Sequence, residues 1–322
     1  SRRIVVWLNL PFEIYRSYRF INDRINKYDM LHTFGDSWAV GFYTCYFSFF
    51  KKPVMRELCN EISTPYFPLP FRSIIKKLFT RDNMMMVAIS PKLETLAIEN
   101  SVKNIWQRPN PVDESKFNLE MGSKKMALRS LISPFSNDDI VLTYVAMFWR
   151  NKNQLFLLRV LSKLKNNYKL VLAGPVTLAH KAYYNDVIAE INKLNLNDRV
   201  FIANKFIDNP QDYIAMSDVY LFPSRHEGLG TPILEAQACG VPVVMNDMPG
   251  ISDKWINIGH AGYVCELDED IWVKNIHKAI AIESRKLDKN AKVIKKLAGS
   301  ETIDKEYFKK INAMCLDLSN EY

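Results

Sequence analysis

Residues 219–244 read VYLFPSRHEGLGTPILEAQACGVPVV, an order that predicts a strand, a turn, a short helix and a second strand. A β-branched and aromatic run ends at Phe222, and the following Pro223 stops the strand. Thr231 is a good N-cap, Pro232 suits the first helical position, and Gly240 is placed to end the helix. The stretch therefore predicts a loop between a strand end and a helix start near Thr231.

Two glutamates, Glu227 and Glu235, bracket this turn and the start of the helix. A carboxylate only accepts hydrogen bonds, and its two oxygens can hold a vicinal pair of hydroxyls, so one glutamate suits a ribose and the other a hexose. The first turn of a helix attracts phosphate through its N–H groups and dipole. Gly228 and Gly230 let the backbone come close to a ligand. Together these features predict a site for a nucleoside diphosphate sugar.

Each glutamate also has an interpretation without a ligand. In the first turn of the helix, Glu235 would stabilise the dipole by about 0.3–1 kcal/mol. Glu227 would be a solvated loop residue. The binding interpretation is favoured because the glycines, the cap, the proline and both glutamates coincide in one short stretch.

This stretch resembles the Glu-x7-Glu signature of retaining glycosyltransferases with the GT-B fold, specifically the large family 4 class. In that family the first glutamate contacts hydroxyls of the donor sugar and the second binds the ribose hydroxyls. The resemblance implies these roles for Glu227 and Glu235. The residues between them that we expect at the donor are Gly228, Leu229, Gly230 and Thr231.

Two further segments resemble donor-binding loops of this family. In the first, Lys152 aligns with a lysine that neutralises the donor diphosphate, but Met147 stands where the family has an arginine. A single ammonium still stabilises the leaving diphosphate as its charge grows, so Lys152 joins Glu227 as a candidate catalytic residue. Arg150 either supplies the missing charge or is an exposed loop cation. The second segment resembles the loop beside the nucleotide base and comprises Asn204, Lys205 and Phe206.

Strands alternate with helices on both sides of a stretch, residues 110–139, that has little periodicity and is predicted to be a linker. Such alternation implies parallel sheets covered on both faces. With the resemblance, it predicts two Rossmann-like domains whose sheets face across a cleft. We expect an acceptor-side domain over residues 1–115, a donor-binding domain over residues 116–300, and a C-terminal helix over residues 301–322 that can return to the first domain.

The predicted elements follow from runs of apolar residues and from their flanking caps and turns. The expected strands are residues 4–8, 30–34, 54–58, 84–89, 140–146, 169–173, 199–202 and 220–222. The expected helices are residues 20–28, 38–50, 91–100, 155–164, 183–194 and 210–216.

The N-terminal half departs from the family pattern. The family's first domain opens with a strand and a glycine-rich loop, and nothing before Ile4 supplies them. We therefore expect a fragment of a longer protein with an incomplete first domain, the alternative being an unusually small domain. Phe34 stands where the family has a histidine, and the nearby His32 is interpreted as a packed histidine.

Length and composition exclude several classes of protein. The 322 residues are enough for two domains, and 48% hydrophobic with 24% charged residues is typical of a soluble globular chain. Five cysteines, an odd number without a CxxC pair, argue against a disulfide framework or a zinc site and favour the cytoplasm. The sequence has no apolar run near the ~20 residues of a membrane-spanning helix.

The formal net charge of +8 invites an anionic partner. Residues 65–81 separate basic from apolar side chains, so this stretch either lies on an anionic membrane at its inner face or packs on the core. Nucleic acid is disfavoured because the aromatic residues form no stacking platform. The acidic residues 268–270 are interpreted as a solvated loop with no strand leading to it, so no metal is expected.

The leading hypothesis is a retaining enzyme that moves a hexose from a UDP-, GDP- or ADP-sugar to a hydroxyl of a glycan or lipid-linked glycan in surface polysaccharide synthesis. It needs neither cofactor nor metal. The alternative is a catalytically silent GT-B subunit that binds a nucleotide or a partner protein. Two features motivate this alternative: Met147 in place of the family arginine, and the altered N-terminal half. The donor base, sugar, acceptor, linkage and oligomeric state stay open at this point.

Overall fold

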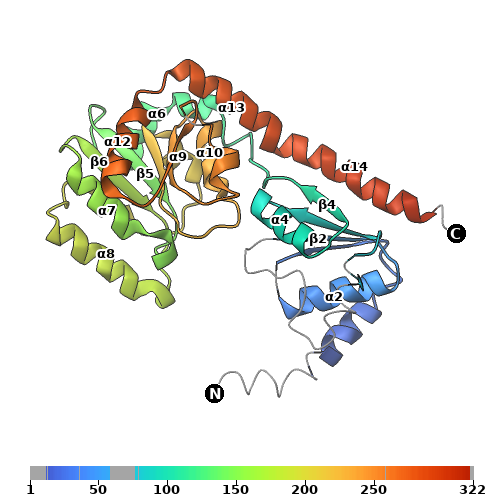
Figure 1. Ribbon diagram of the computed structural model, residues 1–322. Helices are drawn as coiled ribbons and strands as arrows, with labels where there is room; N and C mark the ends of the chain where they lie inside the picture. The colour runs from blue at the N-terminus through green and yellow to red at the C-terminus, as the bar shows by residue number, and fades with distance from the viewer. Residues whose placement is uncertain are drawn as a thin grey trace. The chain divides into compact units, whose positions relative to one another are not determined.

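The computed structural model describes residues 12, 14–35, 37–58, 77–78, 80–257 and 259–319. The chain forms two compact units. The first comprises residues up to Pro109 together with those from Ile303 onward, and the second comprises Asn110–Thr302. Each contains a parallel sheet with helices, which confirms the prediction of an α/β protein with two parallel-sheet domains (Figure 1).

The sheet of the first unit has four described strands, all parallel, and the two described helical connections each return the chain to the same edge. Ser37 and Ser90 cap the two helices of these connections, each accepting a hydrogen bond from a backbone N–H in the first turn. The strands, in spatial order, are β1 (Leu31–Phe34), β2 (Val54–Leu58), β3 (Met84–Ala88) and β4 (Asn104–Gln107). The two helices are α2 (Trp38–Phe49) and α4 (Pro91–Glu99).

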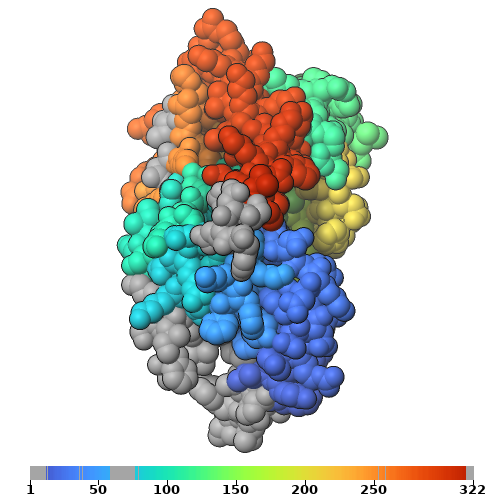
Figure 2. Space-filling view, turned by 90° about the vertical axis from the view of Figure 1, so that its right-hand side faces the viewer, coloured from blue at the N-terminus to red at the C-terminus, as the bar shows by residue number. Residues whose placement is uncertain are grey.

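The C-terminal helix α14 (Ser300–Ser319) covers part of this sheet. Its apolar residues pack against the buried cluster of the strands, which includes Met55, Val87 and Trp106. Figure 2 shows the end of α14, in red, above the blue and cyan residues of the first unit. The helix residues in this contact are Tyr307, Ile311 and Met314.

The predicted strands and helices between residues 30 and 100 are confirmed to within one or two residues. The helix expected over residues 20–28 is wrong in its position: helix spans residues 14–22 and turns follow over residues 23–27. Ile21 and Ile25 are both buried, but Ile25 reaches the core from the turn. The expected strand at residues 4–8, and all of 65–81 except residues 77–78 and 80–81, lie outside the described residues.

The second unit contains a six-stranded parallel sheet that agrees with the strands predicted between residues 140 and 222. Its order places β5 and β8 side by side, with two strands beyond each of them. The strands, in spatial order, are β10 (Gly262–Cys265), β9 (Val243–Asn246), β8 (Val219–Phe222), β5 (Ile140–Val145), β6 (Tyr168–Ala173) and β7 (Val200–Ala203).

Helices cover both faces of this sheet (Figure 1). On one face pack α7 (Gln154–Lys163), α8 (Lys181–Lys193) and α12 (Glu269–Ile280). On the other pack α5 (Leu119–Ser123), α6 (Lys125–Ile132), α9 (Pro210–Ala215), α10 (Thr231–Ala238) and α13 (Ser284–Ala298). Short turns of helix complete the unit: η1 (Arg150–Lys152), η2 (Leu178–His180) and α11 (Ser252–Trp255).

The chain reverses its direction of travel through this sheet between β5 and β8. It runs outward from β5 through β6 to β7, then returns to β8 and runs the other way through β9 to β10. In open parallel sheets a ligand crevice lies outside the carboxyl ends of the strands at such a switch point. The loops after β5 and β8 are therefore the expected place for a ligand.

The prediction that residues 110–139 form a linker is wrong, because α5 and α6 lie within them. Asn118 caps α5, and Leu128 and Ile132 of α6 pack on the core of the unit. These helices could not be predicted from apolar periodicity for two reasons. They are only five and eight residues long, and the inner face of α6 carries the buried Arg129 where an apolar residue would be expected.

The interpretation of the acidic residues 268–270 is wrong in part: Asp268 and Asp270 are exposed as expected, but the stretch is not a loop without a preceding strand. Strand β10 ends just before them, and Asp268 caps α12 by accepting hydrogen bonds from the N–H groups of Asp270 and Ile271. Glu269 pairs with Arg159 and Lys163 of α7, at 2.8 Å and 3.1 Å. These residues therefore begin and anchor a helix. Within the described residues, no three His, Cys, Asp or Glu side chains are grouped as metal ligands, and none of the helices has the length and apolarity of a membrane span.

Candidate functional site

The switch point brings together the two candidate catalytic residues. Lys152 ends η1, which follows β5, and Glu227 lies in the loop after β8. The Lys152 Nζ lies 2.6 Å from the Glu227 Oε1, with 21% and 15% of the two side chains exposed. Because the pair is largely shielded from water, its attraction is screened less than that of a surface ion pair. It holds an ammonium and a carboxylate at the edge where ligands bind.

Asn151 fastens the loops that carry this pair. Its side-chain amide donates to the carbonyl of His226 at 2.7 Å, and its side-chain oxygen accepts from the N–H of His226 at 3.1 Å. The N–H of Arg225 donates to the Asn151 carbonyl at 3.0 Å. These bonds position Lys152 and Glu227 relative to each other.

Asn153 adds a further contact between the loops. It is buried, adopts a left-handed conformation with φ 58° and ψ 37°, and its amide donates to the Pro223 carbonyl at 3.4 Å. Asparagine tolerates this conformation better than most residues. Neither Asn151 nor Asn153 was predicted as a site residue, because both act through side-chain bonds to a loop that is 70 or more residues away in the sequence.

The backbone around Met147 is held tightly at the end of β5. Gly174 has φ +151°, and a Cβ there would lie 2.2 Å from the carbonyl oxygen of Ala146. Gln154 donates from its side chain to the Met147 carbonyl at 2.9 Å. Met147 therefore contributes a fixed backbone to the site, and Lys152 is the cation that this loop places at Glu227.

Helix α10 begins at Thr231, which agrees with the predicted start, but its N-cap lies one residue earlier than predicted. Gly230 is the N-cap, with φ 77° and ψ 50°, a left-handed conformation that favours glycine. Thr231 is the first helical residue, and its hydroxyl accepts from the Asn110 side chain at 3.1 Å, so its prediction as N-cap is wrong. No described side chain caps this helix end, which leaves the first turn open to an anion. Gly240, with φ +72°, follows the helix as predicted.

The residues before this helix combine a buried side chain with glycines, which have none. Leu229 is buried at 3% exposure and fixes the turn to the core. Gly228 beside it is only partly buried. This stretch therefore presents backbone, with little side chain, at the helix start.

Glu235 lies in the second turn of α10, so the interpretation that placed it in the first turn is wrong. It stands one helical turn after Thr231, on the same face of the helix. Burial raises the pKa of Glu235 to about 7. A carboxylate in such a place is stabilised by hydroxyl groups that donate to it, which a ribose has.

We expect the burial of Glu235 to make stability depend on pH. Below about pH 4.5 the carboxyl is protonated whether the chain is folded or unfolded. Between there and about pH 7 only the folded state keeps the proton, so the free energy of unfolding falls as pH rises through this window. Glu235→Gln should therefore stabilise the protein at pH 8 by up to about 3 kcal/mol and have little effect at pH 4.5. Urea unfolding at both pH values checks this, and equal effects at both would contradict it.

Other predicted site residues are not gathered at the pair. Arg150 is 76% exposed, and its guanidinium lies 3.4 Å from Asp186 of α8, which agrees with the exposed-cation interpretation. The base-side residues follow β7, two strands away from β5, or about 10 Å at normal strand spacing. All three are exposed, and their role stays a prediction: Asn204, Lys205 and Phe206, the last with 73% of its surface accessible.

His32 of β1 belongs to a polar network in the first unit. Its Nε2 lies 3.0 Å from Glu57 Oε1, and Glu57 is also bonded to Arg108 at 2.7 Å and to Tyr307 of α14. The hydrogen bonds from His32 and Tyr307, together with the Arg108 charge, hold the pKa of Glu57 below its ordinary value although its burial acts in the opposite direction. The network supports the interpretation of His32 as a packed histidine.

The strand order and the switch-point loops define the class of α/β domain that binds nucleotides at the carboxyl edge of its sheet. Residues 131–298 match the family model described as glycosyl transferases group 1, and the chain belongs to this family.

Curated relatives match over parts of their length. An N-acetylgalactosaminyltransferase of Campylobacter jejuni, named as acting on a diphospho-undecaprenol, is 25% identical over 222 residues, which are 67% of this chain and 57% of that protein. The capsular polysaccharide glycosyltransferase CapH of Staphylococcus aureus is 28% identical over 151 residues, 46% of this chain and 41% of that protein. The chain thus spans between two fifths and three fifths of these two relatives.

Solved structures share the fold. HepE of Anabaena, in complex with UDP and glucose, has a TM-score of 0.76 at 18% identity, covering 92% of this chain and 80% of its own. A glycosyltransferase of Rickettsia africae has a TM-score of 0.77 at 19% identity, covering 94% of this chain and 82% of its own. These likenesses confirm the GT-B fold class.

Proposed function

We propose that the chain is a retaining glycosyltransferase of the family 4 class, which moves a hexose from a nucleoside diphosphate sugar to a hydroxyl. The observation that carries the proposal is the Lys152–Glu227 pair, with 2.6 Å between Nζ and Oε1, at the switch point of the second sheet. The start of α10, without a side-chain cap, follows in the same loop.

In this proposal each site residue binds a different part of the donor. Glu235 holds the ribose hydroxyls, the first turn of α10 and Lys152 hold the diphosphate, and Glu227 binds hydroxyls of the hexose. Asn204, Lys205 and Phe206 lie beside the base. Arg150 is left out of this arrangement because 76% of its side chain is exposed.

In the proposed reaction the bond between the anomeric carbon and the diphosphate oxygen breaks. The acceptor oxygen bonds to the same face of that carbon, and its proton passes to the departing phosphate, so no protein nucleophile is needed. Lys152 stabilises the negative charge that grows on the diphosphate, an electrostatic effect that is usually the largest in catalysis. The proposal includes neither a metal nor a cofactor.

The proposed acceptor is a glycan or lipid-linked glycan of surface polysaccharide synthesis, used at the inner face of the membrane. Support comes from the relatives, one named for a diphospho-undecaprenol acceptor and another for capsular polysaccharide. The silent-subunit hypothesis is not favoured, because the relatives are named as enzymes and the chain retains both members of the Lys152–Glu227 pair.

We expect one of UDP, GDP and ADP to raise the melting temperature more than the other two, because a ligand that binds the folded state stabilises it.

The matching UDP-, GDP- or ADP-hexose should then serve as donor to a lipid-linked glycan, and EDTA should not lower the rate of transfer. NMR of the product should show the anomeric configuration of the donor. An inverted product would refute the retaining mechanism, and no turnover with any donor would favour the silent subunit.

A further inference from the structure

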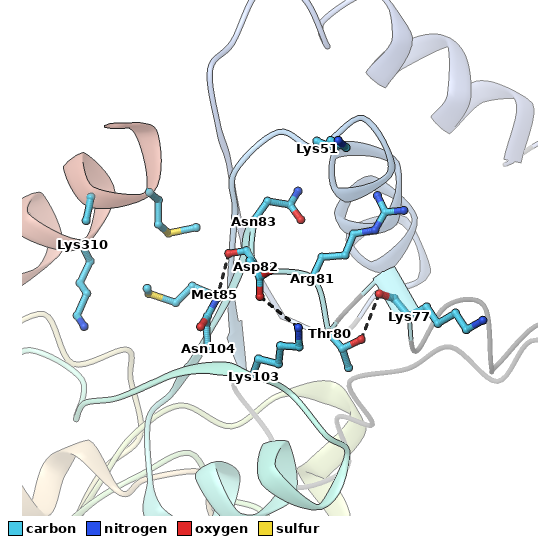
Figure 3. Close-up of a pocket in the computed structure, with 12 residues that line it drawn as sticks. Lys51, Lys77, Thr80, Arg81, Asp82, Asn83, Met85, Lys103, Asn104 and Lys310 are labelled. Atoms are coloured by element: carbon cyan, nitrogen blue, oxygen red, sulfur yellow. Dashed lines mark hydrogen bonds and ion pairs between the residues drawn. The ribbon is translucent and has the colours of Figure 1, made fainter. Parts of the chain in front are cut away.

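A basic pocket of about 770 Å³ opens at the amino-terminal edge of the first sheet (Figure 3). Residues that precede strands line one side of it: Lys51 before β2, Arg81 before β3 and Lys103 before β4. Lys310 of α14 lines the other side. Because parallel sheets bind ligands at their carboxyl edge, this pocket lies at the edge opposite to the usual one.

The charges around this pocket are unbalanced. Among the lining residues that the structure describes, five are cationic and Asp82 is the one carboxylate. Lys103 lies 3.3 Å from Asp82, but both side chains are more than half exposed, so the pair contributes little. The five positive charges therefore exceed the single negative charge by four. The cations are Lys51, Lys77, Arg81, Lys103 and Lys310.

Hydrogen bonds fix the backbone beside two of these cations, Lys51 and Arg81. The Arg81 guanidinium donates to the carbonyls of Ser48 and Phe49 at the end of α2, at 2.8 Å and 3.2 Å. The Asn83 amide donates to the Lys52 carbonyl at 2.7 Å. Fixed loops reduce the cost of ordering the site when a ligand binds.

The lining selects a class of ligand. Lysine ammonium groups bind phosphate as point charges, and an excess of four suits an anion with several negative charges better than a single carboxylate. Met85, Ala313 and Met314 provide an apolar patch on the wall toward α14. The volume is within the range of small-molecule sites, about 300–1,000 Å³.

We propose that this pocket binds a phosphate-bearing ligand with an apolar portion, at a site separate from the donor site. The ligand chemistry has two sources, a phospholipid headgroup and a soluble phosphate ester. Phe49 and Phe50, directly before Lys51, are 62% and 49% exposed. Exposed phenylalanines beside lysines are typical of protein surfaces that insert at the boundary between lipid headgroups and acyl chains, so binding to lipid is expected to be the tighter.

The test compares two double variants of the full chain with equal changes in net charge. Lys103→Glu with Lys310→Glu alters the two sides of the pocket, whereas Lys92→Glu with Lys181→Glu alters exposed positions elsewhere. Sedimentation with phosphatidylcholine vesicles containing phosphatidylglycerol should show at least tenfold weaker binding for the pocket variant and less than threefold for the control. Circular dichroism melting curves check that both are folded.

A second experiment measures binding of a soluble phosphate compound, by calorimetric titration with inorganic pyrophosphate. All proteins in this experiment carry Lys152→Ala, which weakens the donor site and separates this test from the proposed function. Binding of either probe that the pocket variant loses and the control keeps supports the proposal, and the probe that binds identifies the source. Equal binding by the two variants, or binding of neither probe, would overturn it.

Discussion

Lys152→Ala and Glu227→Gln should each lower the turnover number by about 10²–10³-fold, the loss seen when one preorganised electrostatic contact to a transition state is removed. The ammonium of Lys152 is held 2.6 Å from Glu227, so it is in place before the diphosphate charge grows. Glu227→Gln keeps the shape of the side chain but removes the charge that holds Lys152 and accepts sugar hydroxyls. Steady-state rates with the donor found in the nucleotide screen give the measurement.

The matched control is Arg150→Ala, two residues before Lys152. Arg150 pairs with Asp186 and is 76% exposed, so its loss should change the rate less than threefold. Melting temperatures within a few degrees of the unaltered protein would show that the rates report the site. Near-normal transfer by either Lys152→Ala or Glu227→Gln would refute their catalytic roles, and a large loss in Arg150→Ala would restore the hypothesis that it supplies the missing charge.

The elements of the fold were predictable where their signals are local. The two residues Ser90 and Pro91 are enough to predict the start of α4, since serine is a good N-cap and proline suits the first turn. The β-branched and aromatic run that ends at Phe222 likewise predicts β8. The helices α5 and α6 were missed because their stability comes from tertiary contacts. In α6 these include a buried arginine, which a hydrophobic pattern counts as a surface residue.

The site was predictable residue by residue but not as an arrangement. The glycines and glutamates of residues 227–235 carry their own chemistry, so the sequence indicates the type of ligand. The contact between Lys152 and Glu227 spans 75 residues and depends on the reversal of strand order between β5 and β8. Asn151 acts through three hydrogen bonds to the loop after β8, and no local sequence pattern predicts such a role.

Two edges of two sheets carry the candidate ligand sites. The donor residues follow strands β5 and β8 of the second unit, and the basic pocket precedes strands β2, β3 and β4 of the first. Parallel sheets concentrate ligand chemistry at the carboxyl edge because loops and helix N-termini converge there. This rule does not explain a cation-rich pocket at the amino-terminal edge, whereas the proposed phosphate-bearing ligand does.

Arg129→Met should lower the free energy of unfolding by about 3–5 kcal/mol, the usual cost of removing one partner of a buried ion pair. Arg129 is 1% exposed, and its guanidinium donates to Asp218 at 2.8 Å and to the carbonyls of Met216 and Asp139 at 3.0 Å and 2.9 Å. Methionine fills much of the volume but leaves all these acceptors without that donor. Urea unfolding followed by circular dichroism measures the change.

Lys125→Met is the matched control, because Lys125 is bound to the same carboxylate from the outside. Its Nζ lies 2.9 Å from Asp218 Oδ1, and 37% of its side chain is exposed, so its removal should cost at most about 1 kcal/mol. A large difference between the two variants would show that α6 is fastened to the sheet by its buried arginine. Equal and small losses would mean that α6 is held by Leu128 and Ile132 alone, and that the stretch has the weak attachment expected of a linker.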